Sequence, residues 1–435
     1  MQRGPFVHSP ASQTVVADAR PVPWTPRPRP DWVSALNALG DRGGDLAALV
    51  PLDEASLLAA ACESTGLDDF GDDAWREPFR LLLADLDGDA ALNLLGRMLM
   101  RADLVRTLVN RLRMVETRRR HPEIDGLDVR APIVITGMGR SGTSILHELL
   151  ACDPGLRAPM TWEMLHPCAT PGLDADADRD ARIAAADAEW RFWEAVTPEY
   201  AAMHENRGDA PNECLLITMH EFASDYWAGG NWTPRYGRWL QRADFTSVYR
   251  AHRRFLQLLQ WQAPGDEWVL KAPSHLSALP ALFAVYPDAQ VVITHRDPLR
   301  VLGSIVDLLD TLAWQRSDVT HHDAFVARMA GGYPLLWQAV AHQRDTGMVP
   351  DDQIVDVRYA DLMADPHRTV AAIYERLGRD LPDAAVERMR ALLAARPQGH
   401  RGRHDYSFEA LGLDRDATRA AFADYQARYD VPSEV

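Results

Sequence analysis

Residues 132–144 read Pro-Ile-Val-Ile-Thr-Gly-Met-Gly-Arg-Ser-Gly-Thr-Ser, and this stretch decides the fold of the chain. Its first part is a short, continuous apolar run, typical of a strand that is buried on both faces of a parallel sheet. A glycine-rich turn follows, and residues 145–151 continue with a helical pattern. A strand, a glycine-rich turn and a helix N-terminus together form a cradle of backbone N–H groups that suits a phosphate.

The glycine-rich turn departs from the loop of nucleoside triphosphate-binding proteins at one position. Its spacing matches Gly-x4-Gly-Lys-Ser/Thr, but Thr143 stands where the lysine is expected. That lysine normally reaches the β- and γ-phosphates, and here Arg140 supplies the local positive charge instead. The turn therefore indicates a phosphate site that is poorly equipped for ATP or GTP.

Three further apolar runs recur along the chain, and polar or Gly/Pro residues and helical patterns follow them. They are residues 268–271, 290–294 and 354–358. Strands that alternate with helices predict an α/β protein with a P-loop-type parallel β-sheet flanked by helices.

Composition divides the chain into regions of different character. Residues 1–30 are rich in proline and predict an extended arm, and residues 31–128 carry a helical pattern without a chemical constellation. Residues 129–435 form the predicted P-loop domain, within which residues 174–265 read as a helical, aromatic-rich insert.

The charge balance and the cysteine usage exclude several classes of protein. In 435 residues, 46 Lys and Arg stand against 62 Asp and Glu, for a formal charge of −16. Nucleic acid and anionic membrane surfaces are therefore unlikely partners. The four cysteines are scattered and form no CxxC pair, and no apolar run approaches the ~18 residues of a membrane span. We expect a reduced, cytoplasmic protein, with no stable membrane insertion and no structural zinc.

At the glycine-rich turn, the sequence resembles the sulfotransferase superfamily of the bacterial or actinobacterial type, related to the tyrosylprotein branch. The 5′-phosphosulfate loop of that family resembles Arg140, Ser141, Gly142, Thr143 and Ser144. A second element agrees. The family holds the 3′-phosphate with an arginine at a strand end and a serine eight residues later, and Arg296 and Ser304 have that separation. One guanidinium fork and one hydroxyl can bind a phosphate that an ordinary nucleotide lacks.

The resemblance implies the donor 3′-phosphoadenosine 5′-phosphosulfate (PAPS), with 3′,5′-diphosphoadenosine (PAP) as product, and further site residues. Trp162-Glu163 resembles the segment that carries the general base, and Lys271 resembles the strand-end lysine that steadies the leaving phosphate. Tyr359 resembles the aromatic residue at the adenine, and residues 400–406 resemble the basic loop that closes over the nucleotide.

Together these residues predict an in-line sulfuryl transfer without a metal ion. Glu163 is the predicted base, Lys271 and Arg140 stabilise the bridging and equatorial oxygens, and residues 141–144 hold the 5′-phosphate. A positioned base typically contributes ~10²–10⁴-fold.

Alternatives remain open at this point. Glu163 also fits a salt bridge with a loop arginine, and His166 is the nearest rival base. Asp297 as a magnesium ligand would favour a P-loop kinase or NTPase. A third possibility is a nucleotide-binding protein without turnover.

The acceptor is the least specified part of the prediction. Seven of the 13 tryptophans lie between Trp190 and Trp268. They predict either the wall of a pocket for a small hydroxylated acceptor, such as a lipid, sterol or phenol, or the ordinary core of a helical subdomain. The oligomeric state is open between monomer and homodimer.

Overall fold

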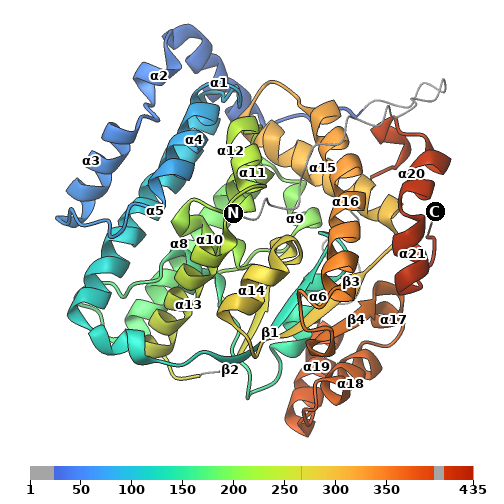
Figure 1. Ribbon diagram of the computed structural model, residues 1–435. Helices are drawn as coiled ribbons and strands as arrows, with labels where there is room; N and C mark the ends of the chain where they lie inside the picture. The colour runs from blue at the N-terminus through green and yellow to red at the C-terminus, as the bar shows by residue number, and fades with distance from the viewer. Residues whose placement is uncertain (1–23, 266, 396–405, 435) are drawn as a thin grey trace.

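The computed structural model describes residues 24–265, 267–395 and 406–434, and its centre is a parallel four-stranded sheet (Figure 1). The strand order is β2-β1-β3-β4. The strands are β1 (Arg130–Gly137), β2 (Glu267–Lys271), β3 (Gln290–His295) and β4 (Ile354–Arg358). The four apolar runs of the sequence are therefore the four strands, and the predicted fold class is confirmed.

Helices cover both faces of the sheet. Successive side chains of β1 point to opposite faces, so they enter two different apolar clusters. Ile133 and Ile135 pack against the helices α6 (Thr143–Leu150), α17 (Tyr359–Ala364), α18 (Pro366–Arg376) and α19 (Asp383–Ala395). Val134, which lies between them, belongs to a second apolar cluster on the other face. That cluster includes α13 (Phe245–Gln262), α14 (Leu279–Val285), α15 (Pro298–Arg316) and α16 (His322–Asp345). Helices on both faces explain why the strands read as unbroken apolar runs.

The N-terminal helices lie together on one side of the molecule (Figure 1). They are α1 (Asp31–Gly43), α2 (Leu46–Leu49), α3 (Glu54–Thr65), α4 (Arg76–Asp87) and the long α5 (Leu94–Arg120). At the start of α5, Asn93 caps the helix by accepting a hydrogen bond from the Gly96 N–H at 2.8 Å. A Cβ at Gly96 would lie 1.9 Å from the Arg316 carbonyl oxygen. This glycine therefore permits the close approach of α5 to the end of α15.

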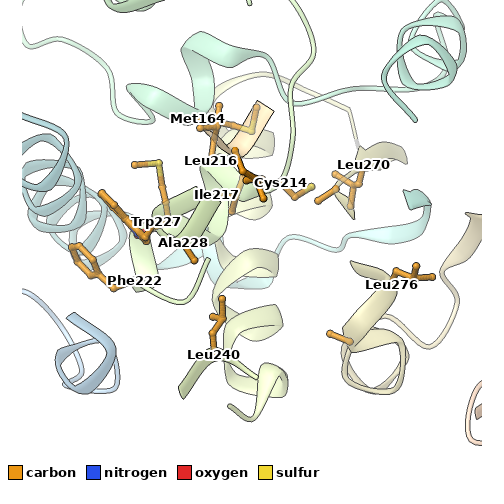
Figure 2. Close-up of a cluster of buried hydrophobic side chains, with 14 of the residues drawn as sticks. Met164, Cys214, Leu216, Ile217, Phe222, Trp227, Ala228, Leu240, Leu270 and Leu276 are labelled. Carbon is orange, nitrogen blue, oxygen red and sulfur yellow. The ribbon is translucent and has the colours of Figure 1, made fainter. Parts of the chain in front are cut away.

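A set of mostly short helices connects α6 to β2. They are α7 (Thr161–Leu165), α8 (Ala175–Val196), α9 (Tyr200–Met203), α10 (Leu215–Thr218), α11 (Asp225–Gly229) and α12 (Pro234–Leu240), followed by α13. Figure 2 shows buried side chains of this region, with Cys214 beside Leu270 of β2 and with Phe222 and Trp227 farther away, toward the N-terminal helices. These contacts join the connecting helices to the sheet in one core.

The chain returns to the sheet through α20 (Arg415–Ala421) and α21 (Ala423–Tyr429). Tyr425 of α21 packs on Trp337 of α16, with ring centroids 4.4 Å apart. Its hydroxyl also accepts a hydrogen bond from the Arg296 N–H, just beyond β3. The C-terminal helices thereby reach the edge of the sheet where the predicted site lies. Among the described helices, none is both long enough and apolar enough to cross a bilayer.

Candidate active site

A cavity of about 1110 Å³ opens above the carboxyl ends of the strands. The glycine-rich turn forms one end, and helices from the connecting region and from α15 and α16 form the rest of its wall. Ligands of open parallel α/β sheets bind at this edge. Several predicted site residues line the cavity, namely Arg140, Gly142, Thr143, Ser144, Arg296 and Tyr359.

The backbone of the glycine-rich turn is held in a tight conformation. Arg140 and Gly142 both have positive φ values, 70° and 92°. A Cβ on Gly142 would lie 2.8 Å from the Tyr359 ring, so this position requires glycine for both conformation and space. The Ser141 hydroxyl donates to the Met138 carbonyl oxygen and pairs with the Thr294 hydroxyl, each at 2.6 Å. Ser141 therefore stabilises the turn from behind instead of presenting its hydroxyl to the cavity.

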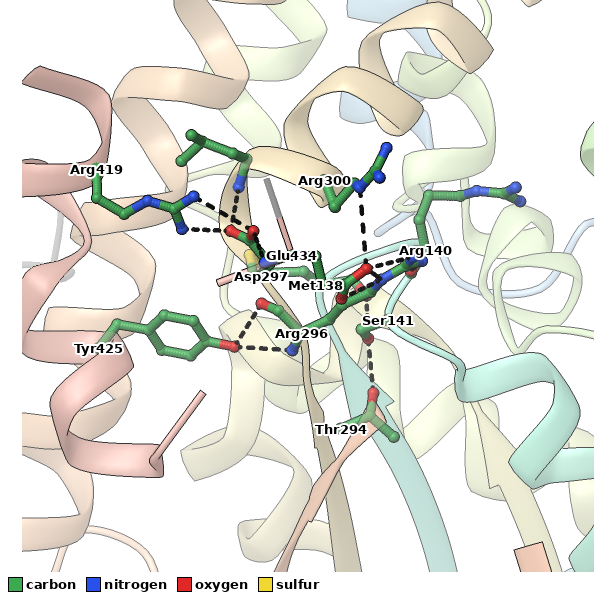
Figure 3. Close-up of polar contacts among 11 residues, drawn as sticks. Met138, Arg140, Ser141, Thr294, Arg296, Asp297, Arg300, Arg419, Tyr425 and Glu434 are labelled. Atoms are coloured by element: carbon green, nitrogen blue, oxygen red, sulfur yellow. Dashed lines mark hydrogen bonds and ion pairs between the residues drawn. The ribbon is translucent and has the colours of Figure 1, made fainter. Parts of the chain in front are cut away.

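The two sequence elements that resemble donor-binding motifs meet in space (Figure 3). Arg140 Nε donates to Ser304 Oγ at 3.0 Å, and Arg296 Nη1 donates to the Arg140 carbonyl oxygen at 2.9 Å. The Arg296 guanidinium also stacks on the Tyr359 ring, 3.9 Å from its centroid. Burial lowers the pKa of Arg140, and the nearby Arg296 charge adds to this effect. The structure thus brings two cations, a hydroxyl and an aromatic ring together beside the turn.

Glu434 neutralises part of this cationic cluster. Its Oε1 accepts from Arg296 Nε at 3.0 Å, its Oε2 accepts from Arg296 Nη2 at 3.0 Å, and Arg300 lies 4.0 Å away. Glu434 is itself anchored, because its N–H donates to Asp297 Oδ2 at 2.6 Å. A carboxylate thus takes the Nε and Nη2 donors along one edge of the Arg296 guanidinium.

A second polar cluster surrounds Lys271, at the carboxyl end of β2. Lys271 is the only lysine of the chain, and all other Lys or Arg positions are arginine. Its ammonium group donates to Glu213 Oε1 at 2.7 Å and to Ser144 Oγ at 3.2 Å. His204 Nε2 lies 4.0 Å from the same Glu213 oxygen. Burial opposes the charge on Glu213, but the Lys271 ammonium and His204 hold the pKa of this carboxyl well below its usual value.

Glu213 and His204 line the cavity, and the sequence prediction included neither. The Cys214 N–H donates to the Lys271 carbonyl oxygen at 2.8 Å, and this backbone bond fixes Glu213 beside the lysine. No local motif surrounds Glu213. Only the packing of the segment 211–214 on the end of β2 identifies it.

The structure does not bring Glu163, the predicted base, to this cavity. Its Oε1 accepts from Arg157 Nη2 at 2.5 Å, and its Oε2 caps α7 by accepting from the Met160 N–H at 2.9 Å. Arg157 in turn lies over the ring of Trp268, near the amino end of β2. The contacts of Glu163 are those of the alternative interpretation, a salt bridge with a loop arginine.

Two other sequence candidates also have structural contacts. Asp297 caps α15 by accepting from the Leu299 N–H at 3.1 Å, and it pairs with Arg419 at 2.6 Å. His166 lies 3.0 Å from Glu189 on α8. Residues 400–405 of the predicted basic loop lie outside the described residues, and Tyr406 packs against Gly303 of α15.

The aromatic residues of the connecting region divide between the two predicted uses. Trp190, Trp193, Tyr200 and Tyr226 line the cavity. Others, such as Trp227, Tyr236 and Tyr249, are buried in the apolar core, and the described part of the cavity wall does not include them. Both interpretations of this region therefore apply, each to different residues.

The family model described as "Sulfotransferase family" matches residues 132–383, more than half of the chain. The chain therefore belongs to the sulfotransferase family, and the resemblance inferred from its sequence is confirmed.

Sulfotransferases of mycobacteria are similar to this chain along most of its length. STF1 of Mycobacterium tuberculosis H37Rv is 32% identical, with a TM-score of 0.74 over 86% of this chain and 98% of the other. STF9 of Mycobacterium avium is 29% identical, with a TM-score of 0.78 over 88% and 97% of the two chains. These similarities also fit the predicted actinobacterial type.

A curated relative is the omega-hydroxy-beta-dihydromenaquinone-9 sulfotransferase Stf3 of Mycobacterium bovis. It is 25% identical over 280 residues, which cover 60% of this chain. The chain spans 66% of the length of this relative, and the protein of the same name from Mycobacterium tuberculosis matches equally.

Proposed function

We propose that the protein transfers a sulfuryl group from PAPS to the hydroxyl group of a small, largely apolar acceptor. The observation that carries this proposal is the position of Lys271, which contacts the phosphate-binding turn through Ser144 and an acid of the cavity wall through Glu213. The apolar part of the cavity continues directly from this cluster. The printed name of the curated relative, with its hydroxylated menaquinone, supports an acceptor of this kind.

The residues at the turn fit the donor. Backbone N–H groups at the start of α6 suit its 5′-phosphate, and Gly142 leaves room between the turn and Tyr359. Arg296 and Ser304 suit a 3′-phosphate, because a guanidinium fork and a hydroxyl donate to its oxygens. Glu434 occupies the Arg296 fork, so binding of the 3′-phosphate would displace this carboxylate.

In the proposed reaction, the acceptor oxygen forms a bond to sulfur while the bond from sulfur to the bridging oxygen of the donor breaks. Lys271 donates a hydrogen bond to that leaving oxygen and stabilises its negative charge. The proton of the acceptor hydroxyl passes to the Glu213 carboxylate. The products are a sulfate ester and PAP.

Glu213 suits the role of base better than Glu163, because it lines the cavity beside Lys271. In the structure, the Lys271 ammonium holds the pKa of Glu213 low and makes it a weak base. When Lys271 turns to the leaving oxygen, this stabilisation of the carboxylate decreases. The basicity of Glu213 then rises at the moment the proton must be taken.

The experiment measures transfer of ³⁵S from labelled PAPS to a panel of phenols, sterols and long-chain alcohols. Glu213→Gln should lower the rate by ~10²–10⁴-fold, whereas Glu163→Gln should leave most of it. The PAP affinity and the melting temperature of both variants are measured as controls. Unchanged values show that a lower rate comes from the loss of catalysis and not from misfolding. Strong loss in Glu163→Gln alone, with an intact fold, would return the role to Glu163. Failure of wild-type protein to transfer to any acceptor, combined with no PAP binding, would overturn the proposed function.

A further inference from the structure

Two charged residues of the cavity wall lack the hydrogen-bond and ion-pair partners that the charged residues described above have. They are Asp225, at the start of α11, and Arg328, on α16. Within the ranges that the structure describes, neither side chain makes a hydrogen bond or an ion pair, and the Arg328 guanidinium carbon lies 5.1 Å from the centroid of the Phe325 ring. By contrast, Lys271 and Arg296 each have a carboxylate partner.

Both unpartnered residues line the cavity. Asp225 is exposed to solvent. Arg328 is half-buried, and its Nε is buried without a partner among the described atoms. Each residue shifts the pKa of the other toward its charged form, but the two form no ion pair in the described part of the chain.

Apolar side chains share the cavity wall with the two charges, as does Tyr333, whose phenol interacts electrostatically with both. Leu309 and Leu312 of α15, together with Met329 and Leu336 of α16, line the same cavity. The buried Arg328 Nε, which has no hydrogen-bond partner among the described atoms, is costly in such a place. A ligand group that binds between the carboxylate and the guanidinium would remove this cost.

We propose that Asp225 and Arg328 form a second binding point for the acceptor, which holds a neutral hydroxyl or amide distant from the hydroxyl that is sulfated. Such a group donates a hydrogen bond to the Asp225 carboxylate and accepts one from the Arg328 guanidinium. This inference rests on the proposed function. It adds that the preferred acceptor is polar at two points, with an apolar body between them.

The second point belongs to the same chamber as the reacting groups. The charge of Glu213 acts on Asp225 through space, and both residues line the one cavity. An acceptor that reaches both would be oriented with one hydroxyl at Glu213 and Lys271. Asp225 and Arg328 are therefore specificity residues of the acceptor site, not catalytic residues.

The test compares α,ω-alkanediols of four to twelve carbons with n-alkanols of equal length. Binding is measured by calorimetry on the full chain, with saturating PAP and again without it. At a matching chain length, the diol should bind at least about tenfold more tightly than the alkanol, because it adds hydrogen bonds to charged groups. Asp225→Asn and Arg328→Met should reduce this advantage to less than about threefold. Asp323→Ala, an exposed acid of α16 outside the cavity wall, is the matched control and should change nothing.

Equal affinity of diols and alkanols at every length would overturn the inference, as would the absence of diol binding or an advantage that survives in both variants. A melting temperature of Asp225→Asn well below that of wild type would also contradict it, since a charge without a partner should not stabilise the fold. The measurement without PAP separates the two proposals. If diols bind more tightly than alkanols but PAP does not bind, the acceptor site at Asp225 and Arg328 is retained and the assignment of the donor is wrong.

Discussion

We call one part of the site the donor half; it comprises residues 137–144, Lys271, Arg296, Ser304 and Tyr359. The described charged groups of this half already have hydrogen-bond or ion-pair partners. In the acceptor half, formed by cavity-lining residues of α8 to α12, α15 and α16, Asp225 and Arg328 face an apolar chamber without one. The donor half is thus a preorganised polar surface at strand ends. The acceptor half is a largely apolar space with two charged groups. Under the proposed function, donor binding exchanges one set of partners for another, whereas acceptor binding supplies partners to groups that lack them.

Removal of the Lys271 charge should give the largest effect. Lys271→Met is expected to lower kcat by about 10²–10³-fold, because the developing charge on the leaving oxygen loses its donor. Lys271→Arg should recover only part of the rate, since a planar fork does not replace a compact ammonium. Initial rates of ³⁵S transfer, with PAP titration as control for folding, test this. Full activity in Lys271→Met would show that Lys271 does not stabilise the leaving oxygen.

Next in size is the loss of the Arg296 fork. Arg296→Ala should weaken PAP binding about 10- to 100-fold, because hydrogen bonds from a charged donor to the 3′-phosphate are lost. Adenosine 5′-phosphosulfate, which has no 3′-phosphate, should bind both proteins alike. Calorimetry with the two ligands makes the comparison. An equal loss for both would place Arg296 elsewhere on the nucleotide.

Acid pH should affect the fold through buried imidazoles, most of which lie outside the donor half. Burial lowers the pKa of His147, His220, His252 and His275 to about 3. Since their unfolded pKa is near 6.5, the unfolded state binds more protons between these values, and stability falls as pH decreases through this window. Each should cost about 1 kcal/mol between pH 7 and pH 5.5. Thermal unfolding across that range measures the loss, and His252→Phe should reduce its slope. A melting temperature independent of pH would contradict the assignment of neutral buried histidines.

The smallest expected effect concerns Glu434, whose carboxylate competes with the donor for Arg296. Glu434→Gln should strengthen PAP binding by no more than about fivefold, because a partly exposed ion pair is worth at most about 1 kcal/mol. Added salt should shrink the difference between variant and wild type. Glu409→Gln, at an acid that pairs with Arg415 away from the site, is the control. Weaker PAP binding in Glu434→Gln would mean that the carboxylate supports the donor site.

The donor half could be predicted because short motifs encode it. A strand end fixes where Arg296 lies, the next helix fixes Ser304, and the turn between β1 and α6 fixes residues 137–144. Each element is local in sequence, and the parallel sheet then aligns the strand ends at one edge.

The positions of Glu213 and Glu434 could not be predicted in this way. Glu213 reaches Lys271 through a backbone hydrogen bond between segments 57 residues apart, and Glu434 meets Arg296 across 138 residues. The resemblance that suggested Glu163 as the base left a salt bridge with a loop arginine open, and the structure shows that contact, with Arg157, together with a helix-cap contact. Both contacts depend on local packing that the sequence does not specify.

Calorimetric titration of the full chain with PAP, AMP and ATP with magnesium is the most direct test of whether the site at the glycine-rich turn binds PAP. The donor half, as assigned here, predicts saturable binding of PAP at least about tenfold tighter than that of AMP, because only PAP carries the 3′-phosphate that Arg296 and Ser304 suit. ATP with magnesium should bind no better than AMP. Tighter binding of ATP with magnesium than of PAP would contradict the account and indicate a kinase or NTPase.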